Sequence, residues 1–172
     1  MSSSSPSPVP RRALLDRLPK PLWRLVGRFL HLYFRMSRGL TLGVRGAVLN
    51  DAGEVLLVRH TYSPGWHLPG GGVEPGETVA DAISKELREE ANVALTGPAV
   101  LHGLFLSYEG ARRDHVAVFV IRHFTRTAPK SSDLEIAEIG FFALSALPET
   151  TTAGTRRRLA EITAGAPIDS RW

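Results

Sequence analysis

The sequence predicts an α/β fold in which a mixed β-sheet lies between helices. Runs rich in Val, Leu and Ile at 40–58 and 99–124 have the composition of β-strands. Two other stretches are predicted to be helical: 78–91, where apolar side chains recur every four residues, and 152–163, where a basic cluster lies beside Leu159 and Ile162. Strands that alternate with helices in this order are typical of a layered α/β domain.

The first strands are predicted on either side of a tight turn. Leu40 to Asn50 and Val55 to Val58 are apolar, and Asn50 to Gly53 between them has turn composition. We therefore expect a β-hairpin here. A loop at 62–66 and a short strand at 67–69 lead to the next feature.

A glycine-rich loop follows, with four glycines and a proline in seven residues. Glycine permits tight turns and lets a ligand approach the backbone closely, because no Cβ stands in the way. The loop is therefore expected to expose its amides and carbonyls. Its residues are Gly70, Gly71, Gly72, Pro75 and Gly76.

The helix after this loop is predicted to begin at Glu77 or Thr78 and to carry its acids on one side. Val79, Ile83 and Leu87 form an apolar stripe that should face the core. Glutamates 86, 89 and 90, at i, i+3 and i+4, project away from that stripe. Three carboxylates this close repel one another unless a cation joins them. A hard divalent ion, Mg²⁺ or Mn²⁺, fits such oxygen ligands and commonly acts together with substrate phosphates.

The loop and helix together resemble the signature of the Nudix hydrolase family. That signature is Gly, five residues, Glu, seven residues, Arg-Glu, an aliphatic, any residue, Glu-Glu, any residue, Gly and an aliphatic. Two positions depart from it, since Lys85 replaces the arginine and Asn92 replaces the second glycine. The resemblance covers about residues 40–150 and implies an α/β/α sandwich. The matching residues are Gly71, Glu77, Glu86, Leu87, Glu89, Glu90 and Val93.

The resemblance also implies an activity and a set of roles. Expected is hydrolysis of the diphosphate linkage of a nucleoside diphosphate derivative, such as ADP-ribose, a dinucleoside polyphosphate, a nucleotide sugar or a nucleoside triphosphate. The Gly71 carbonyl and the three helix glutamates would bind Mg²⁺ or Mn²⁺, with Glu86 or Glu90 closest to the attacking water. Glu77 and Lys85 would orient these groups through an ion pair.

The two departures have physical consequences. Lysine keeps the positive charge of arginine but lacks its bidentate fork, so Lys85 predicts looser orientation and slower catalysis. Asparagine is the second choice, after glycine, for the left-handed conformation that ends a helix, so Asn92 is expected to be tolerated. An alternative function stays open: a nucleotide-sensing or membrane-associated binding module that kept the fold and lost turnover.

Four further residues are candidates for substrate binding. Tyr62 either stacks on a base or sugar or fills core space, and Arg113, in the turn of a second predicted hairpin at 99–124, either contacts a phosphate or is solvated. Glu135 and Glu138 precede a strand at 139–142, where the family resemblance implies an additional glutamate. The alternative for both acids is an ordinary surface role.

Composition bounds the remaining possibilities. The 172-residue chain contains no cysteine, which excludes disulfides, thiol nucleophiles and cysteine metal sites. The chain has 21 Lys and Arg and 17 Asp and Glu, and residues 1–40 contain eight of these bases and one of these acids. Residues 41–172 therefore carry thirteen bases and sixteen acids, a net charge of −3. No nucleic-acid partner is expected for an acidic body. We predict a disordered tail at 1–10, a basic amphipathic helical leader at 11–38, a Nudix hydrolase domain at 39–165 and a C-terminal tail at 166–172.

The leader is predicted to contain a helix at about 21–36 with a basic stripe and an apolar face. It is too charged to span a bilayer, which requires about 20 apolar residues, and it lacks the features of a signal peptide. Packing of its apolar face on the body or on a second subunit, as in a homodimer, is the favoured interpretation. Peripheral contact of residues 21–36 with anionic lipid is the other. The expected location is therefore cytoplasmic, with or without peripheral membrane contact.

Overall fold

The computed structural model describes residues 29–30, 33, 39–107, 114–127, 132 and 134–172. The chain divides into two compact units, 1–39 and 40–172. In the first unit the described residues 29, 30 and 33 are helical. The predicted N-terminal tail at 1–10 and most of the predicted leader at 11–38 lie outside the described residues. In the described part of the chain, no helix combines the length and hydropathy needed to cross a bilayer.

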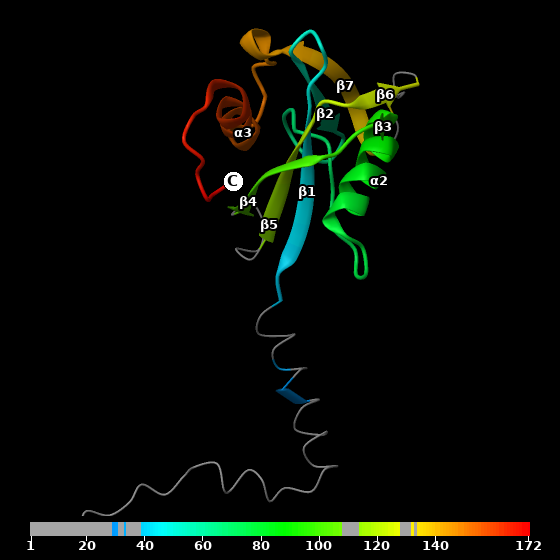
Figure 1. Ribbon diagram of the computed structural model, residues 1–172, viewed down its shortest axis with the longest axis vertical. Coiled ribbons are helices and arrows are strands. Elements are labelled where there is room, and N and C mark those ends of the chain that lie inside the picture. The colour runs from blue at the N-terminus through cyan, green and yellow to red at the C-terminus, as the bar shows by residue number, and fades with distance from the viewer. Residues whose placement is uncertain (1–28, 31–32, 34–38, 108–113, 128–131, 133) are drawn as a thin grey trace, which may run out of the picture. The chain divides into compact units, whose positions relative to one another are not determined.

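The second unit contains seven strands and two α-helices among its described residues, with a short 3-10 helix before the last one (Figure 1). Their order is β1 (Thr41–Val48), β2 (Glu54–His60), α2 (Val79–Ala91), β3 (Val93–Leu95), β4 (Val100–Ser107), β5 (Asp114–Ile121), β6 (Phe124–Arg126), β7 (Ile136–Ala143), η2 (Leu144–Ala146) and α3 (Ala153–Ala164).

The strands form mixed pairings, as the sequence predicted. β5 lies between β1, to which it is parallel, and β4, to which it is antiparallel. β2 pairs with β7 and β3 pairs with β6, both antiparallel. The β4–β5 pair is the second predicted hairpin, with Ser107 opposite Asp114.

The first predicted hairpin is correct only at its turn. Gly53 N–H donates to the Asn50 carbonyl, and Leu49 and Val55 form a single antiparallel bridge. Beyond that bridge the strands separate, because β1 pairs along its length with β5 whereas β2 pairs with β7. The local turn signal was real, but long-range pairing decided the partner of each strand.

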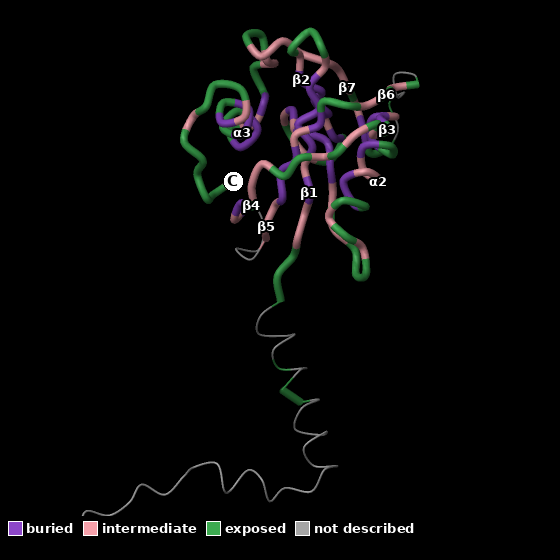
Figure 2. Tube along the Cα trace, in the orientation of Figure 1, coloured by how far each residue is buried: buried purple, intermediate pink, exposed green. Residues whose placement is uncertain are grey.

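Two apolar clusters lie on opposite faces of the strands, and each is covered by a helix (Figure 2). On one face Val44, Val48 and Leu56 pack with Ile83 and Leu87 of α2. On the other face neighbouring strand residues pack with Leu159 of α3. Alternate strand residues therefore point to opposite helices. This arrangement confirms the predicted α/β fold with a helix on each face.

The glycine loop lies along the edge of β1 as an irregular extra strand. Gly46 N–H donates to the Pro69 carbonyl, Val44 N–H to the Gly71 carbonyl, and Val73 N–H to the Leu42 carbonyl. Gly70 has a φ of 142°, and a Cβ there would collide with the Val44 carbonyl. Only glycine allows the loop to lie this close to β1, and the loop in turn is fixed beside α2.

Helix α2 begins and ends where the sequence predicted. The Thr78 side chain is the N-cap and accepts a hydrogen bond from Asp81 N–H. Asn92 ends the helix with φ 54° and ψ 32°, in the left-handed region, and its N–H bonds to the Arg88 carbonyl. Asparagine thus supplies the conformation that glycine supplies in the family signature.

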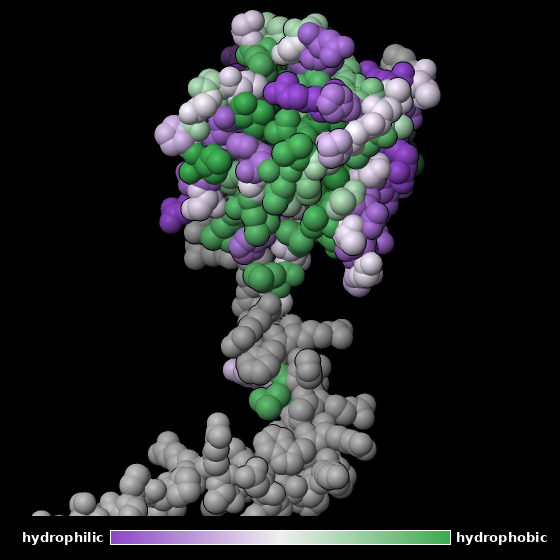
Figure 3. Space-filling view, in the orientation of Figure 1, coloured by the Kyte–Doolittle hydropathy of each residue, from purple (hydrophilic) through white to green (hydrophobic). Residues whose placement is uncertain are grey.

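Residues 166–172 lie against β4 and α3. Leu106 N–H donates to the Ser170 carbonyl, and Trp172 N–H donates to the Leu106 carbonyl. The Trp172 ring packs edge-on against Phe105, with ring centroids 6.4 Å apart. Further along β4, Val100, Leu101 and Leu104 remain exposed, and apolar side chains gather over the middle of the face that Figure 3 shows.

Candidate active site

A cleft of about 440 Å³ opens where the glycine loop, α2 and the first residues of β1 and β5 meet. Acidic side chains line one part of it and mixed polar and apolar groups line the rest. Its lining residues are Thr41, Leu42, Gly43, Arg45, Tyr62, Gly70, Gly71, Gly72, Glu86, Glu90, Ser107, Asp114, His115, Val116 and Glu135.

The three α2 glutamates differ in burial because the helix turns them progressively toward the strands. Glu89 is exposed, Glu86 is half-buried, and Glu90 is only 5% exposed. Glu90 Oε2 accepts a hydrogen bond of 2.8 Å from Gly70 N–H. The glycine loop therefore fixes one oxygen of the deepest carboxylate and leaves the other oxygen, Oε1, turned toward His60.

Burial raises the pKa values of two of these acids. Desolvation, opposed by the Gly70 hydrogen bond and by Arg45, raises the pKa of Glu90 to about 7, with the charges of Glu86 and Glu135 adding to the rise. Desolvation is also the main reason that the pKa of Glu86 is raised, and the charges of Glu89 and Glu135 add to it. Carboxylates that resist ionisation together are those that a bound cation would stabilise.

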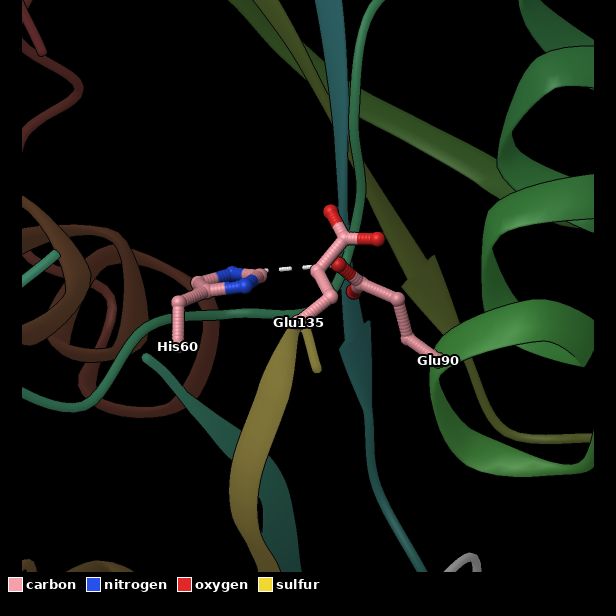
Figure 4. A group of neighbouring side chains, drawn as sticks. All are labelled: His60, Glu90 and Glu135. Atoms are coloured by element: carbon pink, nitrogen blue, oxygen red, sulfur yellow. Dashed lines mark ion pairs between the residues drawn. The ribbon is translucent and has the colours of Figure 1, made fainter. Parts of the chain in front are cut away.

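Three potential metal ligands from distant parts of the chain meet at the cleft, where Glu90 and Glu135 line it and His60 lies beside them. His60 ends β2, Glu90 lies near the end of α2, and Glu135 immediately precedes β7 (Figure 4). Their ligand atoms all lie within 4.8 Å of one another, and His60 Nε2 is 3.7 Å from Glu90 Oε1. In Figure 4 the three side chains point toward one shared space.

His60 is buried as a neutral ring. It is 5% exposed, and neither ring nitrogen has a hydrogen-bond partner among the described residues. Desolvation, with the positive charge of Arg45 next, lowers the pKa of His60 to about 4. At neutral pH the imidazole therefore keeps a lone pair available to a metal ion or a proton donor.

Two glycine-loop positions require close contacts. A Cβ on Gly71 would lie 2.5 Å from Glu86 Oε1, so only glycine permits this carboxylate to approach the loop backbone. The Gly71 carbonyl accepts the N–H of Val44, and the Gly70 carbonyl accepts a hydrogen bond of 2.7 Å from Arg45. Arg45 also donates to the Leu68 carbonyl and thus holds the loop while placing a positive charge in the cleft.

Lys85 lies at the outer end of the carboxylate group. Its Nζ is 3.8 Å from Glu77 Oε1 and 3.3 Å from Glu74 Oε1. Glu77 Oε2 in turn accepts the N–H of Glu74. The ammonium therefore ties the start of α2 to the loop.

The remaining predicted substrate-binding residues separate into two groups. Tyr62, 70% exposed, lies at the mouth of the cleft, stacks on His60 with centroids 5.1 Å apart, and donates a 3.2 Å hydrogen bond to Glu135. Glu138 is not among the lining residues of the cleft and pairs with Arg59 on the neighbouring strand. Arg113 lies outside the described residues.

Several residues in or beside the cleft were not among the predicted site residues, and they include Arg45, His60 and His115. Arg45 is a charged residue between Val44 and Gly46 in an apolar run, a pattern that could have marked it as functional. His60, in contrast, follows Arg59 and precedes Thr61 and carries no such mark. His115, near the start of β5, also lines the cleft. Nothing in the spacing of these residues reveals that their strands meet beside α2.

Comparison with known proteins gives a consistent family assignment. The chain matches the model of the NUDIX domain over residues 39–162. A MutT NUDIX hydrolase from Burkholderia pseudomallei has a similar structure, with a TM-score of 0.63 and 29% identity. The match covers 72% of this chain and 98% of that chain. A NUDIX hydrolase from Nitrosomonas europaea superposes with a TM-score of 0.62 at 21% identity, covering 73% and 90% of the two chains.

Curated relatives include proteins named for different substrates. The mouse 8-oxo-dGDP phosphatase NUDT18 is 29% identical over 134 residues, 74% of this chain and 40% of that protein. An RNA pyrophosphohydrolase from Pseudomonas putida is 46% identical over 60 residues, 35% of this chain and 34% of that protein. The chain thus spans well under half the length of the curated relatives it matches.

Proposed function

The chain belongs to the NUDIX family, and from its cleft we propose that it is a metal-dependent hydrolase of the diphosphate linkage of nucleoside diphosphate derivatives. The family match extends over most of the chain, which confirms the resemblance noted in the sequence. The activity is supported by one observation above the others. Carboxylates of α2 and the segment before β7 converge with the glycine loop in a single cleft.

The residues of the cleft fit a divalent cation. Raised pKa values of Glu86 and Glu90 and a buried imidazole without hydrogen bonds, as far as the structure is described, are features that a cation would relieve. Glu86, Glu89 and Glu90 would hold Mg²⁺ or Mn²⁺. The Gly71 carbonyl, which already accepts the Val44 N–H, would contribute its second lone pair. Such an ion neutralises phosphate charge and activates water.

The protein side chains divide the remaining work. We assign water activation to Glu86, because its carboxylate is half-buried, lies against the Gly71 backbone and has a pKa that desolvation raises above its ordinary value, which favours proton transfer. Glu90 remains fixed by Gly70 N–H and acts as a ligand. Lys85 and Glu77 hold the loop against the start of α2. Arg45 supplies positive charge for a substrate phosphate.

Tyr62 is the proposed platform for the nucleoside. Its ring is exposed at the mouth of the cleft, and its hydroxyl is held by Glu135. A ring held in this way offers a flat apolar face for a base or sugar at low entropic cost. Glu135, rather than Glu138, is the additional glutamate in this proposal, because Glu138 pairs with Arg59 outside the cleft lining.

The substrate class is tested by release of phosphate or nucleoside monophosphate. The panel contains ADP-ribose, diadenosine polyphosphates, nucleotide sugars and nucleoside triphosphates. Oxidised guanine nucleotides are added because two relatives are named as enzymes that act on 8-oxo-dGDP or 8-oxo-dGTP. Each is assayed with Mg²⁺, with Mn²⁺ and with chelator. We expect metal-dependent turnover that falls at least about 100-fold in Glu89→Gln, whereas Glu138→Gln serves as a matched control that retains activity.

The binding-module alternative predicts a different outcome of the same experiment. Nucleotide binding detected by calorimetry, with no turnover of any substrate in either metal, would contradict the hydrolase proposal and favour a sensor. Cytoplasmic location, peripheral lipid contact of residues 21–36 and a homodimer remain predictions. Vesicle sedimentation and the solution mass of the full chain would test the last two.

A further inference from the structure

Beside Glu90 and Glu135 of the cleft lies a histidine that the carboxylate signature of the family does not require. Both nitrogens of His60 are buried without a hydrogen-bond partner among the described residues, although proteins rarely bury polar nitrogens in this way. The ring is not turned toward apolar neighbours alone. It faces Glu90 at 3.7 Å and lies in the same group of ligand atoms as Glu135.

We propose that His60 is a nitrogen ligand of a divalent metal ion that it shares with Glu90 and Glu135. The site would join the end of β2, the end of α2 and the segment before β7. It shares Glu90 with the proposed hydrolase centre and rests in that respect on the proposed function, but its existence does not require turnover.

The geometry is suited to a single ion. Metal–ligand bonds of about 2.1 Å place two ligands of one ion about 3 to 4 Å apart. The 3.7 Å between His60 Nε2 and Glu90 Oε1 lies in that range, yet is too long for a hydrogen bond between them. Glu135 lies within the same 4.8 Å group, and its side chain is exposed and can close the remaining distance.

The hydrogen bonds of Glu90 leave the required atom available. Its Oε2 accepts the Gly70 N–H, whereas Oε1 is the atom directed at His60. Two carboxylates and a neutral imidazole balance a divalent charge. All three groups gain a partner when one ion lies between them, which explains why an imidazole without hydrogen bonds is buried beside two acids.

The ligand types also predict which metal binds. A site of oxygens alone suits Mg²⁺, while an imidazole nitrogen favours first-row transition ions such as Mn²⁺ and Co²⁺. The chain should therefore bind Mn²⁺ more tightly than Mg²⁺. That preference should depend on His60.

The test uses Mn²⁺ as the probe on the full chain after treatment with chelator. Electron paramagnetic resonance of free Mn²⁺ gives the affinity, and electron spin-echo modulation of bound Mn²⁺ reports directly bonded ¹⁴N. We expect ¹⁴N modulation in the wild type, its loss in His60→Gln, and Mn²⁺ affinity lower by about tenfold or more in that variant. Glu135→Gln should weaken Mn²⁺ while keeping the nitrogen signal.

His67→Gln is the matched control, because the His67 ring lies 5.9 Å from that of His60 and its Nε2 contacts the Pro64 carbonyl. This variant should keep the wild-type affinity and nitrogen signal. Wild-type Mn²⁺ bound without ¹⁴N modulation, or modulation unchanged in His60→Gln, would overturn the inference. If His60→Gln fails to fold, two other results together would support the inference. The nitrogen signal should be present in both the wild type and His67→Gln, and Mn²⁺ binding should be weaker in Glu135→Gln, since His60 is the described histidine grouped with Glu135.

The inference and the proposed function fail separately. Oxygen-only coordination together with metal-dependent turnover would reject His60 as a ligand and leave the hydrolase intact. Nitrogen coordination without turnover of any nucleotide would support the ligand and count against the hydrolase.

Discussion

Gly70 N–H donates a 2.8 Å hydrogen bond to Oε2 of Glu90, so the glycine loop and the end of α2 are joined at the deepest carboxylate of the cleft. Desolvation of that carboxylate raises its pKa to about 7, which means that the ionised form is costly where it lies. The group is expected to serve function at the expense of stability.

Substitution Glu90→Gln tests this trade-off. The amide oxygen can still accept the Gly70 N–H, and a neutral side chain removes the cost of a buried charge. We expect turnover to fall at least about 100-fold, with a melting temperature in chelator, at pH 7.5, equal to or above that of the wild type. A clear drop in melting temperature would show that the ionised carboxylate stabilises the fold.

Glu90 and His60 should give opposite pH dependence of stability in the metal-free protein. The pKa of Glu90 in the folded protein, about 7, lies above its ordinary value of 4.5. Between pH 4.5 and 7 the folded state therefore binds more protons than the unfolded state, so the contribution of Glu90 to the free energy of unfolding falls as the pH rises. The folded pKa of His60, about 4, lies below 6.5, so its contribution rises with pH between 4 and 6.5. The two effects oppose each other in the wild type.

Each variant should therefore reveal the opposite slope. Relative to the wild type, the free energy of unfolding of Glu90→Gln should rise by up to about 3 kcal/mol from pH 4.5 to 7. That of His60→Gln should fall by up to about 3 kcal/mol from pH 4 to 6.5. Urea unfolding at half-unit pH steps in chelator measures both. Parallel profiles of all three proteins would show that neither group titrates with a shifted pKa.

The sequence predicted features that are encoded locally. The start of α2 at Thr78, its left-handed end at Asn92 and the beginning of α3 after Thr152 all depend on side chains within one helical turn. The glutamates of α2 were found for the same reason, since three- and four-residue spacing fixes them on one side of a helix.

The unpredicted features depend on contacts between distant residues. His60 meets Glu135 only because β2 pairs with β7, in which His60 lies opposite Ile136, 76 positions further along the chain. Likewise, β1 does not pair along its length with β2, its expected partner, because it pairs with β5. The choice between Glu135 and Glu138 also depended on register, which places Glu138 opposite Arg59. No local pattern contains that information.

Substitution Lys85→Arg tests the departure from the family signature. The Lys85 ammonium reaches Glu77 at 3.8 Å and Glu74 at 3.3 Å as a single charged point, whereas a guanidinium could bind a carboxylate with two parallel hydrogen bonds. We expect kcat to rise by about threefold to tenfold, with little change in melting temperature because Lys85 is partly exposed and its nearer partner, Glu74, is exposed. Arg88→Lys, on the same helix, is the control that should leave kcat unchanged. An unchanged kcat in Lys85→Arg would show that lysine already orients the loop fully.

Glu161→Ala should separate stability from activity. Glu161 Oε1 accepts a 2.6 Å hydrogen bond from the fully buried Arg158 and another from Asp169 N–H, and Oε2 lies 3.0 Å from His102 Nε2. The Arg158 guanidinium also stacks 3.8 Å above the Phe105 ring, so it has no route to solvent when its partner is removed. An uncompensated buried charge costs about 3 to 5 kcal/mol.

The Glu161→Ala variant should therefore lose about 3 kcal/mol of unfolding free energy in urea, while the exposed control Glu149→Ala loses little. Because α3 covers the face opposite α2, kcat at 25 °C should stay within about twofold of the wild type. A kcat loss that matches the stability loss would instead show that the α3 face is coupled to the cleft.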